Sequence, residues 1–228
     1  MKASVSAIRP ITDAHGDLPT PGSSDAFAAL RRFARGRRAP ADQCELCGTE
    51  IGNEHRHLFN HESRQIACSC DACAILFCGQ EGGKFLRVPL RVLRLEGFSF
   101  TELQWEAMML PINLAFFFKR SDGATTAFYP SPAGAMESLI GLPPWQELFG
   151  GEPELCGLQT EVEALIVNRI DKEAAYFVVP IDACYRLVGL IRTNWRGLSG
   201  GVEVWKAIAD FFAELQQRAT TTGERSHA

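Results

Sequence analysis

The chain lacks the long apolar run that a membrane-spanning helix needs, and it lacks an excess of positive charge. Its most apolar segment, 107–118, contains Pro111 and Asn113 and is too short to cross a bilayer. Residues 1–10 contain no continuous apolar core, so we expect no signal peptide. The formal net charge of −4 gives no global basic field that would attract nucleic acid. These absences predict a cytoplasmic protein without a membrane span.

Common catalytic fingerprints are also missing. We find no Walker loop, no dinucleotide-binding fingerprint and no paired-carboxylate site. Residues 197–201 fit the G-x-S-x-G hydrolase pattern, which needs a strand before the serine and a catalytic histidine after it. A helix is expected before Ser199, and the only later histidine is His227. We therefore reject a serine hydrolase, interpret this stretch as a connection between two helices and assign no catalytic residue.

The composition fits a globular protein with one sizeable domain and a smaller module. The chain has 228 residues, of which 46% are hydrophobic and 22% are charged, as in ordinary globular proteins. The predicted segments are a flexible tail over 1–22, a basic helical arm over 23–40, a cysteine-rich module over 41–84, an α+β domain over 85–219 and a flexible tail over 220–228.

A group of arginines marks the end of the arm helix, which Asp25 is expected to cap. The group comprises Arg31, Arg32, Arg35, Arg37 and Arg38. One interpretation is a solvated helix end, since cations suit a helix C-terminus. The other is an arm that grips an acidic partner or nucleic acid. Nucleic acid is the less favoured partner because the whole chain is acidic.

The richest chemistry lies between residues 44 and 73, where five cysteines and three histidines occur. Two Cys-x-x-Cys pairs, Cys44/Cys47 and Cys70/Cys73, have 22 residues between them. Each pair offers two thiolates from one turn, and two facing turns form the tetrahedral four-sulfur site that a structural zinc prefers. A knuckle, a hairpin and a helix over 70–77 that Ser69 caps would then resemble a treble-clef zinc fold.

The sequence leaves open which residues bind the metal, whether there is a second site and which metal is bound. A second ligand set is Cys44, Cys47, Cys68 and Cys70. A second site of His55, His57 and Cys68 is another interpretation, because both histidines share one strand face and the hairpin brings them near Cys68. These histidines could instead donate hydrogen bonds to the cluster sulfurs. Iron is the alternative to zinc, as in rubredoxin, although the second pair lacks the glycine that follows Cys47.

The larger region is expected to mix antiparallel hairpins with helices, which is an α+β architecture. Expected strands cover 86–95 with a bulge, 111–119 with 125–129, and 162–170 with 174–180. Expected helices cover 101–109, a segment that begins at Ser131, a segment from Asp182 to Trp195, and a last one after Gly201 whose apolar face includes Trp205.

Two further groups have a functional interpretation beside a structural one. Arg192, Arg196, Gly200 and Gly201 could form an anion pocket, although a turn with solvated arginines is simpler. Cys184 lies in the first turn of a predicted helix, where its pKa could be lowered, but burial in the core is preferred. Cys78 and Cys156 are likewise expected to be buried.

The quoted motifs, together with the stretch from Pro180 to Trp205, resemble one bacterial family of unknown function over residues 41–219. Its genes often lie beside those of uptake [NiFe] hydrogenases, so the resemblance implies an accessory or maturation role with a hydrogenase subunit or maturation factor as partner. We therefore expect a zinc-binding, non-enzymatic accessory protein. The alternatives are an iron- or labile-metal-binding redox or metal-handling protein and, more weakly, a nucleic-acid-binding zinc protein.

Overall fold

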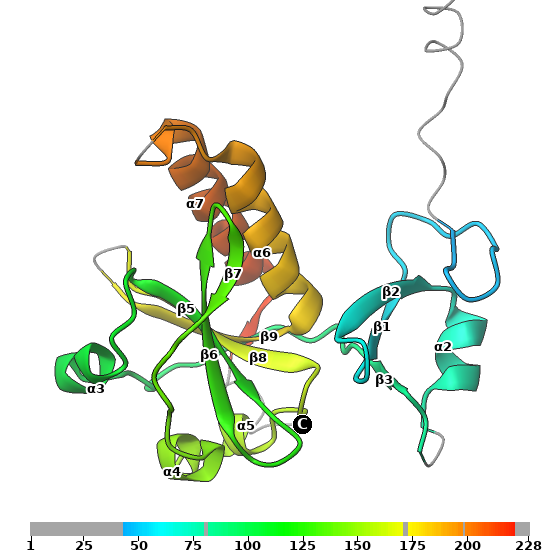
Figure 1. Cartoon of the computed structure of the whole chain (residues 1–228), viewed down its shortest axis with the longest axis horizontal. Helices are drawn as coiled ribbons and strands as arrows, with labels where there is room; N and C mark the ends of the chain where they lie inside the picture. The colour runs from blue at the N-terminus through cyan, green and yellow to red at the C-terminus, as the bar shows by residue number, and fades with distance from the viewer. Residues whose placement is uncertain (1–42, 80–81, 171–172, 198, 222–228) are drawn as a thin grey trace, which may run out of the picture. The chain divides into compact units, whose positions relative to one another are not determined.

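Two β-sheets and their flanking helices make up the part of the chain that the computed structural model describes, residues 43–79, 82–170, 173–197 and 199–221 (Figure 1). The predicted tail over 1–22, the arm over 23–40 and residues 222–228 lie outside these ranges. The strands are β1 (Arg56–Asn60), β2 (Gln65–Ser69), β3 (Phe85–Arg87), β4 (Leu93–Arg94), β5 (Leu114–Lys119), β6 (Thr125–Ser131), β7 (Gly134–Glu137), β8 (Glu163–Asn168), β9 (Ala175–Pro180) and β10 (Thr220–Thr221). The helices are α2 (Asp71–Phe77), α3 (Glu102–Ala107), α4 (Trp145–Phe149), α5 (Pro153–Cys156), α6 (Ile181–Asn194) and α7 (Gly201–Arg218).

The cysteine-rich region folds as a knuckle, a hairpin and a helix, in the order expected of a treble-clef-like module. Strands β1 and β2 form an antiparallel hairpin, and β3 pairs with the other edge of β1, which gives the order β2-β1-β3. Helix α2 follows β2 directly. Leu58, Ala74 and Phe85 form a small buried core between β1, α2 and β3.

The second sheet has the strand order β10-β4-β9-β8-β5-β6-β7. All its neighbouring strands are antiparallel except β10 and β4, which are parallel. The predicted hairpins β5/β6 and β8/β9 are confirmed, with the turn at 171–172 outside the described residues. Mixed helices and antiparallel sheets confirm the α+β class.

The central strands are buried on both faces, which explains their uninterrupted apolar sequences. Successive side chains of a strand point to opposite faces, so Phe116 and Phe118 enter one core cluster and Phe117 enters the other. Helices α6 and α7 lie side by side over the first cluster (Figure 1). The second cluster includes Trp105 of α3, Trp145 and Phe149 of α4, and Leu155 of α5.

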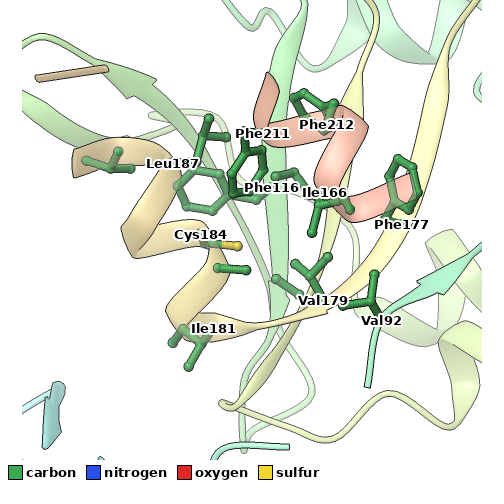
Figure 2. Close-up of a cluster of buried hydrophobic side chains, with 14 of the residues drawn as sticks. Val92, Phe116, Ile166, Phe177, Val179, Ile181, Cys184, Leu187, Phe211 and Phe212 are labelled. Carbon is green, nitrogen blue, oxygen red and sulfur yellow. The ribbon is translucent and has the colours of Figure 1, made fainter. Parts of the chain in front are cut away.

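Helix α7 contributes an apolar face at helical spacing. Its buried side chains are Val204, Ile208, Phe211, Phe212 and Leu215. Trp205, which was assigned to the same face, is 45% exposed, and its Nε1–H donates to the carbonyl of Ser199 at 3.3 Å. Figure 2 shows the buried cluster between helices α6 and α7 and the large sheet. The labelled side chains come from α6 (Ile181, Cys184, Leu187), α7 (Phe211, Phe212) and the sheet (Phe116, Ile166, Phe177, Val179).

The segment 86–95 is not one bulged strand, so that prediction is wrong. Its start belongs to β3 in the small sheet, and its end belongs to β4 in the large sheet. Pro89 lies between them, and proline offers no N–H to a ladder. Val88, beside Pro89, is buried in the first core cluster together with Phe59 of β1. The cysteine-rich module and the α+β region therefore share core residues.

Three other local predictions also fail. The helix expected at Ser131 is absent; Ser131 ends β6, and its Oγ–H donates to the carbonyl of Gly134 at 2.9 Å, closing a tight turn into β7. Pro180, rather than Asp182, is the N-cap of α6. Thr220 and Thr221, assigned to the terminal tail, pair with β4 as β10. Within the described ranges, no helix is both long enough and apolar enough to cross a membrane.

Candidate metal centre

The first Cys-x-x-Cys pair lies in a tight knuckle. The backbone N–H of Cys44 donates to the carbonyl of Thr49, and the N–H of Gly48 donates to the carbonyl of Cys44, both at 2.8 Å. Gly48 has a φ of +75°, a conformation that glycine adopts at little cost. The glycine after the second cysteine thus permits the turn that presents Cys44 and Cys47 together.

The second pair lies at the start of α2. Cys70 is the N-cap, and its Sγ accepts a hydrogen bond from the backbone N–H of Cys73 at 3.4 Å. Ser69, which was expected to cap this helix, instead donates through Oγ–H to the carbonyl of Cys70 at 2.9 Å. A cysteine sulfur thus takes the place of the usual capping oxygen.

The two pairs face each other, and the four sulfur atoms of Cys44, Cys47, Cys70 and Cys73 all lie within 4.8 Å of one another. Thiolates that bind one zinc tetrahedrally, with bonds of about 2.3 Å, lie about 3.8 Å apart. The sulfur atoms of Cys47 and Cys70 are 3.8 Å apart. The donor set and its spacing therefore fit a tetrahedral metal ion.

The sulfurs also differ in their readiness to ionise. Burial opposes ionisation of Cys44, but backbone N–H groups, first that of Cys70, outweigh it and lower its pKa to about 6. Burial, followed by hydrogen bonds with Cys47 and other cluster thiols, raises the pKa of Cys73 to about 12. A divalent cation would resolve this conflict, because it stabilises every coordinating thiolate.

A second group of ligand atoms comprises His55, His57 and Cys68, which also lie within 4.8 Å of one another. His57 of β1 is directly opposite Cys68 of β2 in the antiparallel register. Cys68 therefore belongs with the histidines in this structure, and the four-cysteine group contains Cys70 and Cys73 rather than Cys68.

The histidines make specific contacts away from the four-cysteine group. His55 Nδ1 lies 2.8 Å from the carbonyl oxygen of Gly52. His57 Nδ1 lies 2.7 Å from Oδ2 of Asp182, in the first turn of α6. Sequence reasoning missed Asp182 as a site residue, because 125 positions separate it from His57 and no spacing rule relates them.

Glu45, in the knuckle, was also missed. Its backbone N–H donates to the carbonyl of Cys68 at 2.9 Å, and its Oε1 accepts from the backbone N–H of Cys68 at 2.7 Å. These two bonds hold the knuckle beside β2, between the two groups of ligands.

The predicted anion pocket remains a prediction, but Arg196, one of its two arginines, has a structural role. The segment 197–201 connects α6 and α7, as expected. The guanidinium of Arg196 donates to the carbonyls of Thr193 at 3.1 Å and Trp195 at 3.0 Å, so it binds the end of α6. Gly200 and Gly201 have φ values of +90° and +77° at the start of α7, and Arg192 lies in the last turn of α6.

The remaining cysteines differ in burial. Cys184 is buried in the core as preferred, and burial, followed by the charge of Asp182, raises its pKa, so the alternative of a lowered pKa is wrong. Cys78 is partly buried. Cys156 is exposed, which contradicts the expected burial. It lies at the end of the short helix α5, where its side chain reaches the surface.

Comparisons with known proteins give one family match. Residues 43–219 match DUF5947, described as a family of unknown function, and this segment covers most of the chain. The description names no hydrogenase. A search of curated proteins and a search of solved structures found no match. The chain, with its two groups of candidate metal ligands, therefore belongs to DUF5947.

Proposed function

We propose that this protein is a zinc-binding accessory protein without catalytic activity, in which zinc fixes the module that contacts a partner. The four-cysteine group carries this proposal. Four thiolates fill the tetrahedral coordination of zinc and leave no position for a substrate, which is typical of structural sites. Cys44 and Cys73 are 1% and 6% exposed, so bulk water has little access to these two ligands.

Helix α2 offers a surface for the partner. Ile75, Leu76 and Phe77 are 67%, 63% and 44% exposed. Consecutive exposed apolar side chains are typical of a protein interaction surface. Because Cys70 caps this short helix and Cys73 lies in its first turn, zinc would hold the apolar side chains in place. The resemblance in the sequence makes a [NiFe]-hydrogenase subunit or maturation factor the first partner to test.

The identity of the metal is tested on purified protein by elemental analysis and a visible spectrum. We expect a colourless protein whose four-cysteine group holds one zinc. A reddish chromophore that bleaches on reduction would show iron in the site and would overturn the zinc proposal in favour of a redox protein.

The partner is tested by pull-down with purified hydrogenase subunits and maturation factors. We expect the wild-type chain to bind one of them, and Ile75→Glu to weaken the binding at least tenfold because it places a charge in an apolar contact. Leu103→Glu is the matched control, since Leu103 is 78% exposed on α3. Failure of the wild-type chain to bind any of these proteins would reject the hydrogenase role.

A further inference from the structure

We infer that His55, His57 and Cys68 form a second metal site, open at one position, for a borderline divalent cation such as Zn²⁺. This site goes beyond the proposed accessory role, because a structural zinc in the four-cysteine group needs none of these three residues. The strand register, the direction of each imidazole ring and an unpartnered buried nitrogen support it independently.

The hairpin places the three side chains on one face. His57 and Cys68 are directly opposite each other on β1 and β2. His55 lies two residues before His57, and side chains two apart on an extended chain point to the same side. The two imidazole centroids are 4.8 Å apart with the rings nearly perpendicular, at 81°. The ring planes can therefore converge on one ion without stacking.

The hydrogen bond of His55 determines which nitrogen is available to a metal. A carbonyl oxygen can only accept, so the Nδ1 that faces Gly52 carries the proton. In a neutral imidazole the other nitrogen, Nε2, then holds a lone pair. This Nε2 is buried and has no hydrogen-bond partner among the described residues. A buried acceptor without a partner costs free energy, and a coordinated cation would satisfy it.

His57 also directs Nδ1 toward an acceptor and leaves Nε2 for a metal, but its acceptor is a carboxylate. Its Nδ1 faces the carboxylate of Asp182 at 2.7 Å, so this nitrogen carries a proton, and in a neutral imidazole Nε2 then holds the lone pair. A carboxylate–histidine–metal arrangement orients the ring and increases its basicity as a ligand. Because Asp182 belongs to α6, the second site would also connect the module to the α+β region.

The donor set indicates the class of metal and its coordination. Two imidazole nitrogens and one thiolate suit zinc and similar borderline divalent ions rather than magnesium or calcium, which prefer oxygen. Three protein ligands leave the fourth tetrahedral position for water or an external ligand, as in catalytic rather than structural zinc sites. The metal at this site would therefore exchange more readily than the metal in the four-cysteine group.

The test is a metal titration of the full-length chain, prepared without a histidine tag and freed of metal. Zn²⁺ binding is measured by calorimetry, and Co²⁺ binding is followed by its visible spectrum. We expect two equivalents of either ion in the wild-type chain and one in His55→Ala, with the weaker equivalent lost. His61→Ala is the matched control and keeps both, because His61 lies exposed in the β1–β2 turn.

Asp182→Asn tests the positioning role of this carboxylate. We expect the weaker equivalent to persist with about 10- to 100-fold lower affinity, while the tight equivalent is unchanged and reports an intact module. Unchanged affinity would refute that role. A single equivalent in the wild-type chain, or a second one that survives both His55→Ala and His57→Ala, would overturn the site itself. Cys73→Ser separates the two proposals, since it removes only the four-cysteine equivalent.

Discussion

The guanidinium of Arg91 forms an ion pair with the carboxylate of Glu163, whose side chain is fully buried at the start of β8. Arg91 Nη2 donates to Oε2 at 2.6 Å, and Nε donates to Oε1. The backbone N–H of Gln159 also donates to Oε2, at 2.8 Å. Arg91 lies in the segment between β3 and β4, so this pair fixes the connection between the two sheets to the centre of the large one.

Breaking this pair should cost much more stability than breaking an exposed one. Glu163→Gln leaves the Arg91 charge without its counter-ion, and we expect the free energy of unfolding in urea to fall by about 3 kcal/mol. Glu214→Gln is the control, because its pairs with Arg186 and Arg218 are exposed and should contribute less than about 1 kcal/mol. Equal losses in the two variants would contradict the assigned role of the buried pair.

The choice of ligands in the four-cysteine group can be tested with one pair of variants. Cys70→Ser should lose the tightly bound metal and lower the thermal midpoint, because it removes one of the four thiolates, while the serine hydroxyl can still cap α2. Cys68→Ser should keep the tight metal, since Cys68 lies with the histidines. Metal analysis and a thermal scan measure both effects. Cys70 belongs to both candidate ligand sets, so loss of the tight metal from Cys68→Ser as well would identify the set that contains Cys68 instead of Cys73.

Local sequence patterns predicted the structure correctly where contacts between residues close in the sequence determine it. The two Cys-x-x-Cys pairs, the glycine after Cys47 and the apolar spacing of α7 each reflect a turn or a helix period. The hairpins β5/β6 and β8/β9 were also predictable, because turn residues interrupt long apolar runs. These features determine the α+β class and the proximity of the four cysteines.

Long-range contacts explain what the sequence could not predict. Asp182 is a plausible helix cap by its position, but Pro180 takes that place and Asp182 faces His57 from a distant part of the chain. The alternation around Val88 resembles a continuous strand, yet the chain passes there from one sheet to the other. In both cases tertiary contacts override a valid local pattern.

Two glycine substitutions should change stability in opposite directions. Gly200 has a φ of +90°, and an added Cβ would lie 2.7 Å from Cγ1 of Val204, so Gly200→Ala should destabilise the fold by about 1–3 kcal/mol. Gly189 lies inside α6 with open space around its Cα, so Gly189→Ala should stabilise it by about 0.5–1 kcal/mol. Urea denaturation of both variants measures the difference. A loss of stability in Gly189→Ala would contradict the open surroundings assigned to it.

Removal of metal should loosen the cysteine-rich module before it affects the large sheet. Among the described residues, the module's separate core cluster contains three buried side chains, those of Leu58, Ala74 and Phe85. So small a core contributes little stability without a crosslink. The large sheet has two extensive core clusters that do not involve the sulfurs of the four-cysteine group.

Hydrogen exchange measured by mass spectrometry, with and without a chelator, distinguishes the two regions. We expect faster exchange in the knuckle and α2 of the metal-free chain, and unchanged protection in β8 and β9, because local opening follows the loss of local contacts. Cys73→Ser should reproduce the chelator effect without any added reagent. Uniform loss of protection across both sheets would instead show that the metal stabilises the whole fold through the residues the module shares with the main core, Phe59 and Val88.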